Sequence, residues 1–345
     1  MDNFSQVLAM PGRKSILMGG LGMWKKVVIR PVVIKGEKLW QFSYFDDKKD
    51  VSKNYDLKFS GLKLKQLKNM GYKVSGFEEV GNLGHDRVKN NVLPSDETIE
   101  WLVGIGIQNQ DGSIRADKRD KWEQINQFVK NLKEVWEQAA VTNRPVKIVD
   151  YGCGNAYLTF AAAYFFRDVV KVQIELTGID INQELVSRNN KIAADLGWGD
   201  VKFMVGDIEK SLGNQPVDVG LALHACDTAS DKAIPQAVSA GAEVILVAPC
   251  CQHYVQEQLK AKSPFELVFE DGILKQRLGD ILTDAFRAGW LRTKGYKTDV
   301  VQFIDSKHTP KNLMIRAVKR ADVNTKRYQQ EYLQLKEYWK LEPYL

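Results

Sequence analysis

Segment 146–163 limits the possible folds of this chain more than any other stretch. It reads VKIVDYGCGNAYLTFAAA. A short apolar run ends in Asp150, passes through a turn that contains Gly152 and Gly154, and continues into an apolar run of good helix formers. This pattern predicts a strand, a tight turn and a helix.

The turn favours a ligand that carries an acidic group. Glycines without a Cβ let a ligand lie against the backbone, and the first amides of the following helix carry partial positive charge. The dinucleotide fingerprint needs a third glycine where this chain has Tyr157. Asp150 can instead pair with an ammonium group while the helix start takes a carboxylate. A ligand with an amino acid moiety fits this turn, and a bare tight turn without a ligand is the alternative.

Two further predicted strands end in acidic residues. Segment 173–181 contains Asp180, and segment 201–205 is followed by Asp207. An acid at the end of the second strand can accept both hydroxyls of a ribose, and the next acid can accept the exocyclic amine of an adenine. Together the three acids predict a ligand with an amino acid at one end and an adenosine at the other, which is S-adenosylmethionine.

These motifs, D-x-G-x-G-N at 150–155, G-I-D at 178–180 and G-D at 206–207, resemble those of the class I S-adenosylmethionine-dependent methyltransferases. The resemblance covers about residues 146–319. It implies an α/β fold with a doubly wound, mostly parallel seven-stranded sheet of Rossmann-like type, and S-adenosyl-L-methionine as cofactor. It further implies cofactor contacts from Asp150, Gly152, Gly154, Asn155, Asp180, Ile181, Asp207, Ile208 and Leu223.

A narrower similarity lies in two short motifs, Leu223-His224-Ala225-Cys226-Asp227 and Pro249-Cys250-Cys251-Gln252-His253. They are similar to the His-x-Cys and Cys-Cys-x-His pair of a branch that includes eukaryotic tRNA ribose methyltransferases and uncharacterised bacterial proteins. The tRNA enzymes have glycine where this chain has Asp227.

The two motifs follow predicted strands 218–223 and 243–248, whose carboxyl ends are where open α/β sheets place ligands. Methyl transfer needs alignment of the nucleophile with the methyl group, and removal of a proton if the nucleophile carries one. His224 is the first choice for general base or substrate orienter, and His253 the second. The candidate catalytic residues are His224, Asp227, Cys250, Cys251 and His253.

The cysteines allow other interpretations. A thiolate of Cys250 or Cys251 could add to C6 of a pyrimidine and activate its C5. Zinc could be bound by the cysteines together with His224 and His253, but adjacent cysteines suit one tetrahedral ion poorly, and no metal is expected. A third interpretation is that small, soft side chains fill a crowded strand end.

Strands and helices around this centre complete the expected fold. Segments 297–304 and 312–318 are two strands joined by seven residues, too few for a crossover helix, so they must be antiparallel. Segment 120–140 predicts an amphipathic helix whose Trp122 and Trp136 belong to the core. Segment 322–339 predicts a helix that docks through its aromatic face.

The N-terminal region is basic. Residues 1–75 hold 15 Lys and Arg against 6 Asp and Glu, whereas residues 141–265 hold 11 against 14. Aromatic residues alternate with these cations in a predicted hairpin over 24–45, with Pro31 at an edge, and a short basic helix is expected at 62–70. This asymmetry favours a polyanionic substrate gripped by the N-terminal region, and a solvated lysine-rich surface is the alternative.

A polar cluster at 84–90 supplies the predicted substrate-binding residues, His85, Arg87 and Lys89. Arg87 offers a planar fork suited to phosphate, and His85 can exchange a proton near neutrality. This segment, with 121–128, is similar to an upstream region of bacterial members of the same branch. A loop that only caps the next element is the alternative.

The chain of 345 residues is expected to form a basic α+β region over 1–110, a methyltransferase domain over 111–320 and a C-terminal helix or tail over 321–345. Four cysteines near strand ends and no membrane-length apolar run predict a soluble, cytoplasmic protein. The sequence predicts an S-adenosylmethionine-dependent methyltransferase acting on RNA, either rRNA or tRNA. The alternatives are methylation of a protein or small molecule, and a non-catalytic RNA-binding module with this fold.

Overall fold

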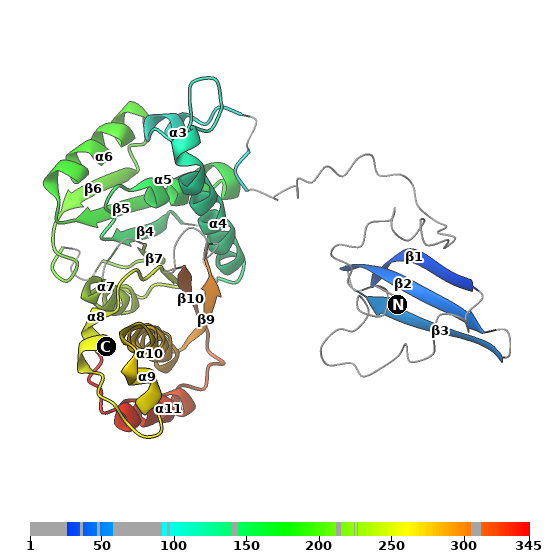
Figure 1. The fold of residues 1–345 in the computed structure, drawn as a ribbon. Coiled ribbons are helices and arrows are strands. Elements are labelled where there is room, and N and C mark those ends of the chain that lie inside the picture. Colours follow the sequence, from blue (N-terminus) through cyan, green and yellow to red (C-terminus); the bar gives the residue numbers. More distant parts are fainter. Residues whose placement is uncertain are drawn as a thin grey trace. The chain divides into compact units, whose positions relative to one another are not determined.

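The computed structural model divides into two compact units, Met1–Lys89 and Asn90–Leu345 (Figure 1). It describes residues 26–34, 37–46, 49–57, 92–94, 97–139, 144–211, 215–223, 225, 227–304 and 312–345. The second unit includes residues 90–110, which we assigned to the N-terminal region. Helix α3 (Glu100–Gly104) explains this difference, because its Trp101 and Leu102 are buried in the core of the second unit.

The first unit contains a three-stranded antiparallel sheet in the order β1-β2-β3. The predicted hairpin is confirmed as β1 (Lys26–Ile34) and β2 (Glu37–Asp46), and Pro31 lies on the edge strand opposite Trp40. Strand β3 (Lys49–Leu57) was not predicted, because its sequence KDVSKNYDL has few apolar residues. The helix expected at 62–70 and the residues His85, Arg87 and Lys89 lie outside the described residues.

The second unit is built on a seven-stranded sheet in the order β6-β5-β4-β7-β8-β10-β9. Its strands are β4 (Val146–Tyr151), β5 (Ile174–Asp180), β6 (Val201–Val205), β7 (Val219–Ala222), β8 (Val244–Val247), β9 (Tyr296–Gln302) and β10 (Leu313–Lys319). The pairings among β4 to β8 are parallel, whereas β10 is antiparallel to both β8 and β9. The predicted doubly wound sheet closed by an antiparallel hairpin is confirmed.

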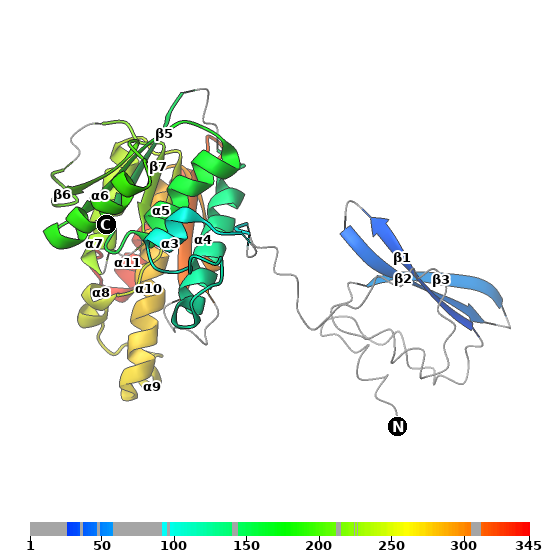
Figure 2. The ribbon, with the colours of Figure 1, turned by 90° about the horizontal axis from the view of Figure 1, so that it is seen from above.

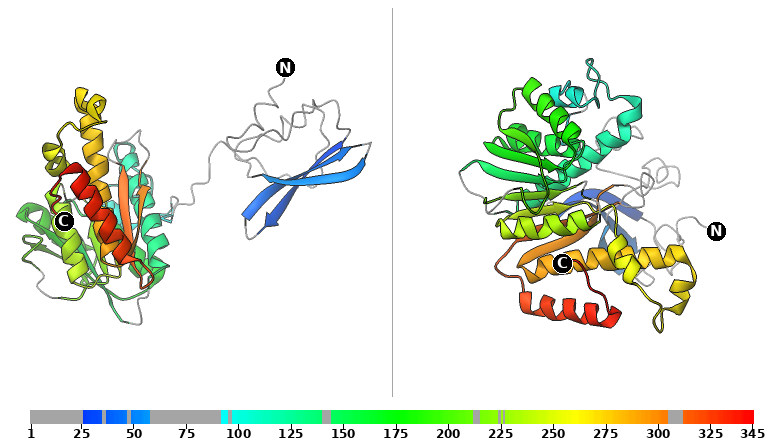
Figure 3. Two further views of the ribbon diagram at one scale, coloured as in Figure 1. Left: turned by 90° about the horizontal axis from the view of Figure 1, so that it is seen from below. Right: turned by 90° about the vertical axis from the view of Figure 1, so that its left-hand side faces the viewer.

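Helices cover both faces of this sheet, as Figure 2 and Figure 3 show. Successive residues of a strand point to opposite faces, so Ile148 of β4 belongs to one core cluster and Val149 to the other. The first face is covered by α4 (Arg119–Trp136), α5 (Tyr157–Tyr164) and α6 (Gln183–Asp195). The second face is covered by α7 (Thr228–Ser239) and α10 (Gly272–Thr293).

Strand β4 lies where the order of the strands reverses. Its neighbour β5 leads to β6 on one side, and β7 leads to β8 on the other. The loops that follow β4 and β7 therefore run to opposite sides at the carboxyl ends of these strands and leave a crevice position between them. Ligands of open α/β sheets bind at such a point. The topology directs attention to the turn after β4.

The C-terminal helix α11 (Thr325–Trp339) packs on α10. Its residues Tyr332, Leu335 and Trp339 contact a third core cluster, so the helix docks through its aromatic face, as the sequence predicted. The short helices α8 (His253–Gln258) and α9 (Glu266–Glu270) precede α10. Within the described ranges, no helix is long and apolar enough to cross a membrane.

Candidate functional site

The turn after β4 has the backbone that its glycines predict. Gly152 has φ 73° and Gly154 has φ 53°, in the left-handed region that glycine adopts at little cost. A Cβ built on Gly152 would lie 3.3 Å from the Cβ of Ala225 in the loop after β7. The amide of Gly154 donates to Oδ2 of Asp180 at 2.8 Å. The acid at the end of β5 thus holds the turn in place.

Asp150 is fully buried at the end of β4. Thr159 on α5 donates to its Oδ2 at 2.5 Å, while no described residue donates to its Oδ1. Burial, together with the nearby charge of Asp180, raises the pKa of Asp150 to about 6, and the hydrogen bond from Thr159 opposes this shift. A buried carboxylate oxygen without a donor costs free energy, so an added ammonium group would be stabilised there.

Asp180 keeps acceptor capacity. Its two carboxylate oxygens accept from the amides of Gly154 and Asn182, at 2.8 and 2.9 Å. A carboxylate has about four acceptor sites, so two remain for a ligand. The next side chain, Ile181, is 79% exposed although it is apolar. The Asp180 carboxylate is suited to accept from the hydroxyls of a ribose, and the exposed Ile181 side chain is suited to contact the flat base attached to it.

Asp207 lies beside Asp180, because the amide of Gly206 donates to the Asp180 carbonyl at 3.0 Å. Asp207 is exposed, and its Oδ1 accepts from the amide of Glu209 at 2.8 Å. The three acids therefore occupy neighbouring strand ends. The other predicted cofactor residues differ in exposure: Asn155 is exposed, Ile208 is half-buried and Leu223 is buried.

Two polar residues near this turn escaped the sequence analysis. Thr159 was the single polar residue in an apolar helix, a signal that could have revealed it. Asn189 on α6 is buried and donates from Nδ2 to the Gly154 carbonyl at 2.9 Å. This hydrogen bond depends on how α6 packs against the turn, so the sequence around Asn189 did not predict it.

The motifs after β7 and β8 meet in space. The amide of Tyr254 donates to Oδ1 of Asp227 at 3.4 Å, which joins the two loops. Asp227 has φ 49° and ψ −122°, an unusual backbone for a residue other than glycine. His253 is exposed at the start of α8, and Cys250 and Cys251 are half-buried. His224 and Cys226 lie outside the described residues.

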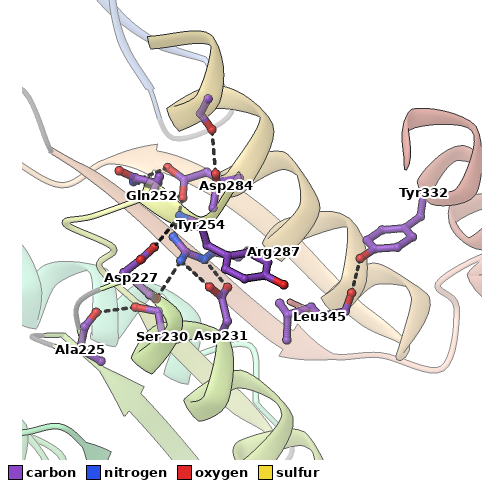
Figure 4. A network of polar contacts seen from close by, with 12 residues as sticks. Ala225, Asp227, Ser230, Asp231, Gln252, Tyr254, Asp284, Arg287, Tyr332 and Leu345 are labelled. Atoms are coloured by element: carbon purple, nitrogen blue, oxygen red, sulfur yellow. Dashed lines mark hydrogen bonds and ion pairs between the residues drawn. The ribbon is translucent and has the colours of Figure 1, made fainter. Parts of the chain in front are cut away.

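A buried ionic network supports these loops (Figure 4). Arg287 on α10 is 0% exposed, and its guanidinium donates to both carboxylate oxygens of Asp231 at 2.6 and 2.9 Å. It also donates to Asp284 at 3.2 Å and to the carbonyl of Asp227 at 3.0 Å. Asp284 in turn accepts from Gln252 at 3.3 Å. One arginine therefore connects the loop after β7 with the loop after β8.

Sequence analysis did not identify Arg287. An arginine and an aspartate three residues apart on a helix usually form an exposed pair. Only the packing of α10 against α7 places this pair in the interior. Elsewhere in the described chain, no group of three or more His, Cys, Asp or Glu side chains is arranged to hold a metal ion.

Comparison with known proteins agrees with the fold. Residues 120–258 match the model of a protein family described as a methyltransferase domain. This stretch contains the turn after β4 and both motifs after β7 and β8. Residues 120–258 therefore resemble a methyltransferase domain, and the sheet around them has the class I strand order.

Curated relatives carry another name. A "Glutathione S-transferase C-terminal domain-containing protein" of Macaca fascicularis and one of Homo sapiens are each 25% identical over 245 residues. Each match covers 63% of this chain and 36% of the relative. The chain thus spans about a third of the length of the curated relatives it matches.

Solved structures are similar at low identity. An rRNA methylase from Streptococcus thermophilus has 14% identity and a TM-score of 0.34, with 57% of this chain and 96% of that chain covered. The magnesium protoporphyrin IX methyltransferase from Synechocystis PCC 6803 with bound SAH has 17% identity and a TM-score of 0.38, with 64% and 93% covered. At these TM-scores the likenesses say nothing about the substrate of this chain.

Proposed function

We propose that this chain binds S-adenosylmethionine at the turn after β4 and transfers its methyl group to RNA. The observation that carries the cofactor assignment is Asp150, a buried acid with one carboxylate oxygen left without a described donor. An ammonium group is the donor that this position favours most, because it would neutralise the charge as well as donate. The backbone amides at the start of α5, directly after the glycine turn, would take the carboxylate of the same amino acid.

The neighbouring strand ends fit the rest of the cofactor. Asp180 has two free acceptor sites for ribose hydroxyls, and Ile181 offers an exposed apolar surface to an adenine. Asp207 could accept from the exocyclic amine, with Ile208 on the other side of the base. Leu223 and Asn155 would complete the enclosure from the loops after β7 and β4.

When bound, S-adenosylmethionine supplies an electrophilic methyl group on a sulfonium. The residues of this chain then have to align the acceptor atom and, where it carries a proton, remove that proton. We propose His224 as general base or substrate orienter, with His253 as the second choice and Asp227 beside it. Attack by Cys250 or Cys251 on a pyrimidine C6 is the covalent alternative.

RNA is proposed as the acceptor because of charge. The chain has a net charge of +6, and residues 1–75, with 15 Lys and Arg against 6 Asp and Glu, carry an excess of nine positive charges. A region of this kind suits the phosphate backbone of RNA. Methylation of a protein or a small molecule, and RNA binding without turnover, are the competing functions. We further propose a cytoplasmic site of action, because the four cysteines of the chain, all near strand ends, make a poor disulfide framework.

Calorimetric titration of the full chain with S-adenosylmethionine tests the cofactor assignment. We expect binding in the wild-type protein and a large loss of affinity in Asp180→Ala. Asp322→Ala is the matched control. This exposed aspartate follows β10, which is antiparallel to β8, so it lies at the ends where the parallel strands begin, away from the turn after β4. Absence of binding, or equal affinity in Asp180→Ala, removes the enzyme assignment.

Labelled methyl transfer to cell extracts tests the acceptor. We expect the label in total RNA and its release by ribonuclease. Label that resists ribonuclease and is lost on protease treatment would assign the protein alternative. His224→Ala is expected to lose turnover on the true substrate, and full turnover in this variant would remove His224 from the mechanism.

A further inference from the structure

Segment 341–345 returns to the edge of the sheet that carries the methyltransferase motifs. Leu341 is 0% exposed and belongs to the third core cluster with Val255 and Phe286. Gln258 on α8 then makes two hydrogen bonds with the backbone of Glu342, at 2.8 and 3.0 Å. The hydroxyl of Tyr332 donates to the Leu345 carbonyl at 2.5 Å (Figure 4). These contacts fix the segment against α8.

This docking brings two tyrosines together. The rings of Tyr254 and Tyr344 lie 5.8 Å apart between centroids, at 77° to one another. Tyr254 is 37% exposed and Tyr344 is 42% exposed, so neither ring is part of the core. An edge-to-face pair of this kind leaves ring surface free for a further planar group.

The tyrosine pair lies beside the proposed site. Tyr254 directly follows His253, and its amide contacts Asp227. On the other side, Lys232 of α7 pairs with Glu209 at 2.9 Å, which raises the pKa of Lys232, and Tyr344 and Asp207 are close enough to add to this effect. The pair therefore lies beside the loop after β7, next to Asp227.

We propose that Tyr254 and Tyr344 form a stacking site for a nucleobase of the acceptor RNA, next to Asp227. This assignment rests on the proposed function. Tyrosine rings stack on unpaired bases of single-stranded RNA, whose faces all carry π-systems. A stacked base at this place would present its nucleotide to the loops that carry His253 and Asp227.

The chain offers a matched control for this site. Tyr338 on α11 is 43% exposed, close to the exposure of Tyr344, and it lies only a few residues earlier in the chain. Its ring is covered by the ammonium group of Lys262 at 3.6 Å from the centroid. Tyr338→Leu therefore removes an equally exposed ring that takes no part in the pair.

The experiment measures binding of the full-length protein to fluorescein-labelled single-stranded RNA oligonucleotides, oligo(U) and oligo(A), by anisotropy. The variants are Tyr254→Leu and Tyr344→Leu, with Tyr344→Phe and Tyr338→Leu as controls. Leucine keeps apolar contact but removes the ring. We expect each leucine variant of the pair to bind RNA about fivefold to hundredfold more weakly. Tyr344→Phe and Tyr338→Leu should bind like the wild type.

Calorimetry with S-adenosylmethionine on the same variants separates this proposal from the proposed function. We expect cofactor affinity unchanged in all four. If the wild type binds cofactor and RNA but the leucine variants of the pair bind RNA normally, the stacking site is wrong and the proposed function stands. A loss of cofactor affinity in Tyr344→Leu with normal RNA binding would assign the ring to the cofactor instead. Failure of the wild type to bind either RNA overturns the stacking site.

Discussion

The loops at the ends of β4, β5 and β6 differ in their electrostatics from those at the ends of β7 and β8. We call the first set the cofactor side and the second the acceptor side. On the cofactor side, the described hydrogen bonds to the carboxylates of Asp180 and Asp207 all come from backbone amides, and Asp150 keeps one oxygen without a described donor. On the acceptor side, Arg287 forms buried ion pairs with both Asp231 and Asp284.

This difference suggests different tasks. Under the proposed function, the cofactor side keeps negative charge available for a cationic ligand, at the expense of folding free energy. The acceptor side uses its charges to fix two loops relative to each other, so that a ligand meets a preformed surface. Four predictions test this comparison, from the largest expected effect to the smallest.

Arg287→Met should cause the largest loss of stability, about 3–5 kcal/mol, because it leaves Asp231 and Asp284 buried without their common partner. Urea denaturation at neutral pH measures this loss. Arg327→Met is the control, since Arg327 pairs with Glu331 at the surface and such pairs contribute about 0–1 kcal/mol. Similar losses in both variants would contradict a supporting role for the network.

Asp150 should make the ligand-free protein less stable as the pH rises. Its pKa is raised to about 6 in the folded state, so its neutral form favours folding below about pH 4 and this contribution is lost as the pH rises through about 6. The loss should approach 3 kcal/mol, at about 1.4 kcal/mol for each pKa unit. Comparison of urea denaturation at pH 4.5 and 7 in the wild type and Asp150→Asn measures about 2 kcal/mol of this loss, because Asp150 of the unfolded chain is already largely ionised at pH 4.5. An identical pH dependence in Asp150→Asn would contradict this origin.

Cofactor affinity should have the opposite pH dependence. If the ionised form of Asp150 binds the ammonium group, the affinity for S-adenosylmethionine should fall about tenfold between pH 7 and pH 5, because only about a tenth of Asp150 is ionised at pH 5. Calorimetry at the two pH values measures this change. Asp150→Asn should bind more weakly and lose this dependence. A wild-type affinity that stays constant over this range would separate Asp150 from the ligand.

Tyr332→Phe should have the smallest effect and should change only the acceptor side. It removes the hydrogen bond to the Leu345 carbonyl, which contributes about 0.5–1.5 kcal/mol. RNA affinity should fall slightly, while affinity for S-adenosylmethionine should stay unchanged. Tyr328→Phe, on the same helix but facing Arg292, is the control. A loss of cofactor affinity in Tyr332→Phe would show that the two sides are not separate.

The sequence determined the sheet and the cofactor side. Apolar periodicity and short turns predicted strands at 146–150, 201–205 and 312–318, and the structure has strands at 146–151, 201–205 and 313–319. The acids that end the first strands follow from the same pattern, because neighbouring parallel strands bring their carboxyl ends to one edge. Local interactions, which act between residues near in sequence, contain this information.

Only the tertiary structure decided the acceptor side. Arg287 meets Asp231 across 56 residues, and Gln258 meets Glu342 across 84. No local pattern selects such partners, because a charged or polar residue on a helix surface can be left in water at almost no cost. The packing of α10 between α7 and α11 removes that water around Arg287 and makes its pairing necessary, whereas Gln258 and Glu342 pair at the surface. The pattern of apolar residues therefore fixed the scaffold, whereas burial chose which polar residues support the site.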